Sequence, residues 1–243
     1  IRDSGCIGFK IGIESGNPDI LRKIRKPASI PILKRASSLL QKFPELFVGG
    51  SYIIGFAGET FSQIMDTFRF SCEMHLDWTS ISVCQFQSWD HSSLTKVEEK
   101  LKKESSFDFI PAKESTKDEL VAEEDIFSGP EVFNIPKDSI PSREELKQIW
   151  FTLNLVGNYI NNKNLKPDGR PEKFVHWIEA VQASYPDNPY MCLFASLGHV
   201  LLGNSDRAKK QYERAKIILA NSDYWQYRFK QFELDKIMGN YPN

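Results

Sequence analysis

The sequence predicts an α/β region with a parallel sheet, followed by an all-α region. Over residues 1–95, short apolar runs typical of strands alternate with amphipathic helical patterns. Residues 96–141 are charged and contain several prolines, whereas residues 142–243 show helical periodicity only. We therefore expect a sheet region, an irregular linking extension and a helical region, with boundaries at these positions.

The composition is that of a globular protein without a charge bias. The chain has 243 residues, 41% of them apolar, and 31 Lys and Arg against 32 Asp and Glu give a net charge of -1. This balance gives no general attraction to nucleic acid or anionic membranes. No apolar run approaches the roughly 20 residues of a membrane-spanning helix, so we expect no membrane span and a cytoplasmic location. Because the chain begins at Ile1, we also expect it to be a piece of a longer one.

The first region reads as strand, helix, helix, strand, helix, strand. Asn17 before Pro18 is typical of a helix start, and Thr60 with Gln63 predicts a capping box. Strands joined through helices form a parallel sheet with right-handed crossovers. Three strands alone leave open edges, so we expect the sheet to continue before residue 1. The expected elements are strand Cys6–Ile13, helix Pro18–Ile24, helix Ile30–Phe43, strand Phe47–Ile54, a helix from Thr60 to about Met74, and strand Thr79–Phe86.

The stretch 96–141 has two interpretations. It is either a long connection with one short helix or a poorly ordered linker.

The C-terminal region begins with a second capping box, Ser142 with Glu145, followed by an apolar face. Four further helices are expected: Pro171–Ser184, Pro189–Leu202, Ser205–Ala220 and Ser222–Met238. A weak repeat of 35 residues relates Trp177 to Tyr212 and Ala180 to Ala215. Together with the positions of Gly203 and Ala208, these helix pairs resemble tetratricopeptide repeats. A generic helical bundle is the alternative.

Polar loops follow the three expected strands at their carboxyl ends, where parallel sheets bind ligands. They are Glu14–Asn17, Gly55–Thr60 and Gln87–His91. In the first two loops, glycines allow close approach of a ligand, and the N–H groups of the following helix can meet an anion. Each residue also has a structural interpretation, in which Glu14 caps a helix, the glycines turn the chain and Glu59 is solvated.

Cysteine and histidine residues predict no metal site in this chain. None of the four cysteines forms a C-x-x-C pair, and we expect reduced, buried thiols; they are Cys6, Cys72, Cys84 and Cys192. His91 beside Asp90 is either a general base or a surface pair. The remaining histidines, His75, His176 and His199, lie in helical patterns without metal-ligand spacing.

Two neighbouring stretches resemble the second half of the catalytic barrel of radical S-adenosylmethionine enzymes. They read IGIESGNPDILRKIRKPASI and GGSYIIGFAGETFSQIMDTFRF, and the likeness covers about residues 5–86. It is closest to the group that often carries a preceding cobalamin-binding domain. The resemblance implies the C-terminal part of a (β/α)6 partial TIM-type barrel, here followed by the tetratricopeptide-like helical hairpins. In that family a C-x-x-x-C-x-x-C motif holds a [4Fe–4S] cluster; the motif is absent here, so the resemblance puts the cluster ligands outside this chain.

The resemblance also implies an activity and its cofactors. The parent protein would cleave S-adenosylmethionine reductively to a 5′-deoxyadenosyl radical, or methylate with cobalamin, and modify a small-molecule, peptide or carrier-bound substrate. A flavodoxin or ferredoxin would supply electrons, and the helical tail could bind a protein partner. The alternative is an interaction or scaffold protein with a degenerate, non-catalytic barrel. A doubly wound nucleotide-binding domain is weaker, because G-x-G-x-x-G and G-x-x-x-x-G-K-[ST] are both missing.

Carried over by position, the resemblance assigns roles at the strand ends. Glu14 suits the ribose hydroxyls or the amino group of S-adenosylmethionine, while Ile53 and Gly55 lie along the adenine. Lys26 matches a recurrent basic residue, with a solvated lysine as the alternative. Ala57 replaces the usual proline, and the loop after Phe86 differs from the common one, which leaves the substrate class open. The implied cofactor-binding residues are Glu14, Ser15, Gly16, Asn17, Ile53, Gly55 and Phe86.

Overall fold

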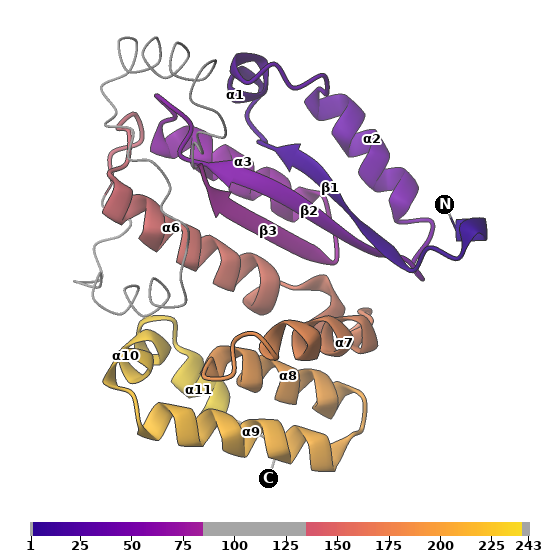
Figure 1. Cartoon of the computed structure of the whole chain (residues 1–243), viewed down its shortest axis with the longest axis vertical. Helices are drawn as coiled ribbons and strands as arrows, with labels where there is room; N and C mark the ends of the chain where they lie inside the picture. The colour runs from indigo at the N-terminus through magenta and orange to yellow at the C-terminus, as the bar shows by residue number, and fades with distance from the viewer. Residues whose placement is uncertain (1, 85–134, 240–243) are drawn as a thin grey trace, which may run out of the picture. The chain divides into compact units, whose positions relative to one another are not determined.

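The structure is a computed structural model that describes residues 2–84 and 135–239 (Figure 1). The chain divides into two compact units, Ile1–Asn158 and Tyr159–Asn243. The first unit contains the sheet, and the second is made of helices.

A three-stranded parallel sheet forms the centre of the first unit, with strand order β1-β2-β3. The strands are β1 (Gly8–Glu14), β2 (Phe47–Ile54) and β3 (Trp78–Val83). Their parallel pairing confirms the prediction from the strand–helix alternation. A short 3-10 helix, η1 (Arg2–Ser4), precedes β1, and Cys6 lies ahead of the strand rather than inside it.

The helices of this unit begin where local sequence predicts. They are α1 (Pro18–Lys23), α2 (Ile30–Leu40), α3 (Phe61–Glu73) and α6 (Arg143–Leu155). Both predicted capping boxes are present, and Asn17 caps α1. The expected extension of α2 to Phe43 is wrong: Pro44 follows Phe43, and a residue before proline is disfavoured in helical conformation.

The two faces of the sheet differ in character. One face carries large apolar side chains that pack with α1, α2, α3 and α6 into one core, including Ile13, Tyr52, Ile54 and Ile81. Because side chains alternate along a strand, the intervening positions lie on the other face. We call this second face the open face; it consists of Gly12, Ser51, Ile53, Ser80 and Ser82, which are half-buried or exposed.

Helix α6 lies along the outer edge of β3, as Figure 1 shows. Asn154 of α6 and Asn158, in the π-helical turn that follows α6, each point a side-chain amide at this edge. The Asn158 side chain accepts from the Thr79 N–H at 2.6 Å and donates to the Thr79 carbonyl at 2.6 Å. Asn154 makes the same pair of bonds to Ile81, at 3.2 and 3.0 Å. The two amides thus occupy the positions that a neighbouring strand would take.

The placement of α6 bears on the domain organisation. From its sequence, α6 was expected to group with the helices that follow it, whereas in the structure α6 lies in the unit of the sheet. The boundaries near residues 95 and 141 stay a prediction.

Residues 135–142 connect to the sheet unit through the start of α3. The carbonyls of Ser139 and Lys137 accept from the N–H groups of Phe61 and Ser62, both at 2.9 Å. Ile135 is buried in the same core. Two interpretations were open for the stretch 96–141, and its residues 96–134 lie outside the part of the chain that the structure describes.

The second unit is helical throughout its described length. A π-helical turn, η4 (Val156–Ile160), crosses the boundary between the units, and a 3-10 turn, η5 (Lys163–Leu165), follows. The helices are α7 (Pro171–Gln182), α8 (Pro189–Leu201), α9 (Ser205–Ala220), α10 (Asp223–Gln231) and α11 (Leu234–Gly239). Helices α8 and α9 form a hairpin, in which the Ser196 hydroxyl donates to the Ala208 carbonyl at 2.7 Å.

Two details of this unit differ from expectation. The single helix expected over Ser222–Met238 is divided at Glu233, which has φ 57°. In one continuous helix, Phe229 and Leu234 would point about 140° apart, whereas the break lets both be buried. Ala180 is exposed although Ala215, its counterpart at 35 residues, is fully buried.

Candidate functional site

The ends of β1 and β2 lie side by side at one edge of the sheet. Glu14 is in register with Tyr52, and Ile54 is in register with Val83 of β3. The loops that the sequence analysis singled out after β1 and β2 therefore begin at neighbouring positions, at the carboxyl edge. This is the edge where parallel sheets of this kind bind ligands.

Glu14 ends β1 in an unusual conformation. Its φ is 71°, and the ladder to β2 is irregular between Gly12 and Glu14. The carboxylate folds back over Gly12, where an added Cβ would lie 2.7 Å from Oε1. Lys26 approaches the same oxygen, with Nζ 3.2 Å from Oε1. Among the described residues, no hydrogen bond reaches the second carboxylate oxygen, so this oxygen can accept from a ligand.

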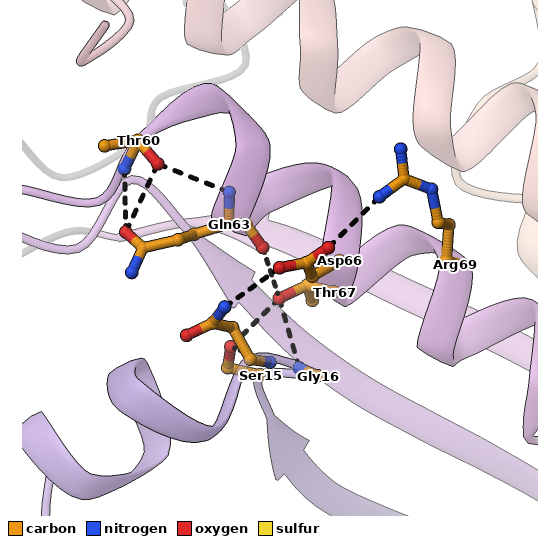
Figure 2. A network of polar contacts seen from close by, with 8 residues as sticks. Ser15, Gly16, Thr60, Gln63, Asp66, Thr67 and Arg69 are labelled. Carbon is orange, nitrogen blue, oxygen red and sulfur yellow. Dashed lines mark hydrogen bonds and ion pairs between the residues drawn. The ribbon is translucent and has the colours of Figure 1, made fainter. Parts of the chain in front are cut away.

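The next three residues anchor the first loop to α3 (Figure 2). The Ser15 hydroxyl lies 2.9 Å from the Thr67 hydroxyl, and the Gly16 N–H donates to the same Thr67 oxygen at 3.1 Å. Asn17 donates to Asp66 at 2.9 Å while its Oδ1 caps α1. The side chains of Ser15 and Asn17 therefore have structural partners within the chain.

Gly16 is required by close packing. A Cβ at this position would lie 2.4 Å from Phe70 Cβ and 2.9 Å from the Asp66 carbonyl oxygen. The loop thus rests directly on the backbone of α3.

The second loop is held from within by Glu59. The Glu59 Oε2 accepts from the N–H groups of Gly55 at 2.6 Å and Phe56 at 3.0 Å. Glu59 is 1% exposed, which rules out the solvated alternative, and its buried Oε1 has no hydrogen-bond partner among residues 2–84 and 135–239. Burial raises the pKa of Glu59 to about 7, although the two N–H donors and the charge of Lys23 oppose the rise.

The predicted use of helix N-termini for an anion is wrong in this structure. At α1, the Asn17 side chain already accepts from the N–H groups of Asp19 and Ile20. At α3, the first N–H groups are bonded to carbonyls of residues 137 and 139. The donors that an anion would need are therefore satisfied by the protein itself.

Ile53 and Gly55 offer an apolar side chain and a half-buried stretch of backbone at the end of β2. Ile53 lies half-buried on the open face, and Gly55 has φ 80°. An added Cβ at Gly55 would lie 2.9 Å from a methyl carbon of Leu146 in α6. Across the loop, the Lys23 ammonium donates to the Ala57 carbonyl.

The cysteines are free thiols, but the expectation that all are buried is wrong. Cys192 is buried, Cys6 and Cys84 are half-buried, and Cys72 is exposed. Cys84 follows β3 at the same carboxyl edge, and burial, with a smaller contribution from the charge of Glu59, raises the pKa of its thiol to about 11. His199 is buried and lies 2.8 Å from Glu179, a structural pair within the second unit.

Four predicted positions near the third loop, Phe86, Gln87, Asp90 and His91, lie outside the described residues. Within residues 2–84 and 135–239, no three His, Cys, Asp or Glu side chains come together as metal ligands.

These features can be compared with what the expected cofactors require. S-adenosylmethionine presents hydrogen-bond donors and a flat ring, and the Glu14 oxygen, the Ile53 side chain and the Gly55 backbone fit those groups. A [4Fe–4S] cluster requires three grouped cysteine thiolates, and the described residues do not fit it.

Comparison with known proteins gives no match to any protein-family model and none to any curated protein. None of the described helices combines the length and apolar character that crossing a bilayer requires.

Two residues at this edge have roles that the sequence analysis did not identify. Glu59 fixes the second loop, and Lys26 is paired rather than solvated. Lys26 lies twelve residues from Glu14, in the loop after α1, so no local pattern could indicate the contact. For Glu59, the GFAGE stretch was a local signal, because an acid shortly after glycines can bond to the N–H groups of its own turn.

Proposed function

We propose that this chain is part of a radical S-adenosylmethionine enzyme and that it forms one wall of the cofactor site. The wall consists of Glu14, Ile53 and Gly55. The observation that carries the proposal is the adjacency of the acidic end of β1 and the glycine-containing end of β2 at the carboxyl edge.

The topology supports a singly wound barrel segment. When consecutive right-handed crossovers add strands in one direction, their helices all cover the same face of the sheet. Here the strand order is β1-β2-β3, and α1, α2 and α3 contribute to one core with one face. In a (β/α)6 partial barrel, the opposite face would line the interior. The small and polar residues of the open face would then leave space for ligands there.

Each residue of the wall has a defined chemical role in the proposal. The free oxygen of Glu14 accepts a hydrogen bond from the ribose hydroxyls or the amino group of the ligand. Ile53 provides an apolar surface for the adenine ring, and the backbone of Gly55 continues that surface along the ring. When bound, S-adenosylmethionine supplies a 5′-deoxyadenosyl radical or, with cobalamin, a methyl group.

The remaining components come from the resemblance alone. The cluster would be held by residues outside this chain, and a flavodoxin or ferredoxin would supply the electron. The substrate would be a small molecule, a peptide or a carrier-bound group.

Binding of S-adenosylmethionine to the natural protein that carries this chain tests the proposal. We expect saturable binding in equilibrium dialysis. Glu14→Gln should weaken this binding about tenfold, because the side chain that accepts a hydrogen bond from the ligand loses its charge. Glu73→Gln, which removes an exposed carboxylate in a surface ion pair with Lys34, is the matched control and should bind normally. Absence of binding by the unaltered protein, or equal binding by Glu14→Gln, contradicts the proposal.

A second candidate function is protein interaction through the helical unit. It is favoured by Leu201 and Ile217, which are 53% and 63% exposed on α8 and α9. Substituting both by Lys should abolish partner capture by the full chain and leave S-adenosylmethionine binding unchanged. Unchanged capture would contradict a binding surface at these residues.

A further inference from the structure

We propose that Lys26 is a positioning residue that fixes the Glu14 carboxylate at the carboxyl edge of the sheet. This inference rests on the proposed function, because it concerns how Glu14 is presented to the ligand. The contact that carries it joins Lys26 Nζ to Glu14 Oε1 at 3.2 Å.

The backbone of Glu14 does not by itself fix the carboxylate in place. A left-handed conformation is costly for a residue other than glycine, so it persists only where the surroundings hold it. Gly12 leaves room for the carboxylate, and Lys26 Nζ would lie 3.5 Å from a Cβ at Gly12. The ammonium group therefore lies over the same point of β1 as the carboxylate and holds one of its two oxygens.

Lys26 is itself delivered by the end of α1. The Ile24 N–H donates to the Ile20 carbonyl at 2.9 Å, and the Lys26 N–H donates to the Leu21 carbonyl at 2.9 Å. Arg25 between them has φ 56°, the conformation that commonly ends a helix. The chain thus turns at Arg25 and places Lys26 next to the end of β1.

Burial distinguishes this pair from the other Lys–Glu contacts. The side chains of Lys26 and Glu14 are 27% and 24% exposed. Those of Lys34 and Glu73 are 55% and 56% exposed, although their atoms are closer, at 2.7 Å. Exposed ion pairs contribute little because water and salt screen them, whereas a half-buried pair is screened less. The contact with Lys26 can therefore restrict the Glu14 carboxylate, whereas the exposed contact with Lys34 would not restrict the Glu73 carboxylate in this way.

The test is a set of variants of the natural protein, each measured for S-adenosylmethionine affinity by equilibrium dialysis. We expect Lys26→Met to raise the dissociation constant about tenfold, the change expected when one charged hydrogen bond is lost. Lys26→Arg keeps a cationic donor and should recover most of the affinity. The double variant Glu14→Gln with Lys26→Met should bind no worse than Glu14→Gln alone, since Lys26 acts through Glu14. Lys34→Met is the matched control and should leave the affinity unchanged.

The outcomes separate this inference from the function it rests on. If the unaltered protein does not bind S-adenosylmethionine, the proposed function fails and this inference fails with it. If the unaltered protein binds and Glu14→Gln weakens binding, but Lys26→Met does not, only the positioning role is overturned. A double variant with the summed loss of both single variants would also overturn it. If circular dichroism shows that Lys26→Met does not fold, Lys26→Gln replaces it in the same comparison.

Discussion

The two loops at the carboxyl edge of the sheet are fixed in different ways. The loop after β1 depends on another element: Ser15 and Gly16 bond to Thr67 of α3 (Figure 2). The loop after β2 depends on its own residue, since Glu59 accepts from Gly55 and Phe56. The contacts of the first loop with Thr67 use neutral hydroxyl and amide groups, whereas the second loop uses a buried carboxylate. They should therefore respond differently to packing changes and to pH.

The largest expected effect is a packing change in the first loop. Gly16→Ala should lower the free energy of unfolding by more than about 3 kcal/mol, because its Cβ would overlap α3 and neither side can move easily. Urea unfolding measures this. Gly58→Ala is the matched change in the second loop. Of the described residues, only the end of the Lys23 side chain is near Gly58, and the strain of φ 71° costs about 1 kcal/mol. Equal losses would contradict the distinction between the loops.

The second loop should make stability depend on pH. The folded-state pKa of Glu59, about 7, lies above the ordinary value of 4.5, so the folded protein binds this proton more tightly. The resulting stability is fully present below pH 4.5 and is lost as the pH rises through about 7, a change of about 3 kcal/mol.

Glu59→Gln should remove this dependence, because the amide keeps an acceptor for both N–H groups without a charge. Urea unfolding between pH 4 and 9 measures it, with Glu73→Gln at an exposed ion pair as the control. The same slope in the unaltered protein and Glu59→Gln would show that Glu59 is not its source.

A hydrogen-bond change in the first loop should have a smaller effect. Thr67→Val keeps the side-chain shape but removes the oxygen that accepts from Gly16 and meets Ser15. The buried Ser15 hydroxyl then loses a partner, which should cost about 2 kcal/mol. Because no group in this contact titrates, the loss should be the same at pH 5 and pH 8. A loss that varied with pH would contradict the neutral character of the contact with Thr67.

The smallest effect is expected at the rim of the same network. Arg69 pairs with Asp66 at 3.1 Å, and both side chains are largely exposed. Arg69→Met should change the free energy of unfolding by less than about 0.5 kcal/mol, as for most exposed ion pairs. A loss comparable to that of Thr67→Val would show that Arg69 belongs to the buried part of the network.

Local patterns in the sequence were sufficient for most element boundaries. The start of α3 is set by Thr60 and Gln63, and the start of α6 by Ser142 and Glu145; in each pair the two residues are three positions apart. Strand β2 is found over the predicted residues because its apolar run is bounded by turn residues. These features need no knowledge of the rest of the molecule.

Features that depend on distant contacts could not be read in the same way. The break at Glu233 arises because Phe229 and Leu234 are both buried, which no local rule indicates. The assignment of α6 to the sheet depends on Asn154 and Asn158 meeting a strand more than 70 residues away. At the candidate site, the position of Glu14 was predictable, but its pairing with Lys26 was not.

The amides along β3 have a consequence for assembly. A strand edge with unsatisfied N–H and C=O groups invites pairing with other chains, and proteins commonly protect such edges. Here Asn154 and Asn158 occupy the donors and acceptors of Thr79 and Ile81, so an incoming peptide would first have to displace α6. A strand that extends this sheet without displacing these amides would therefore pair along β1.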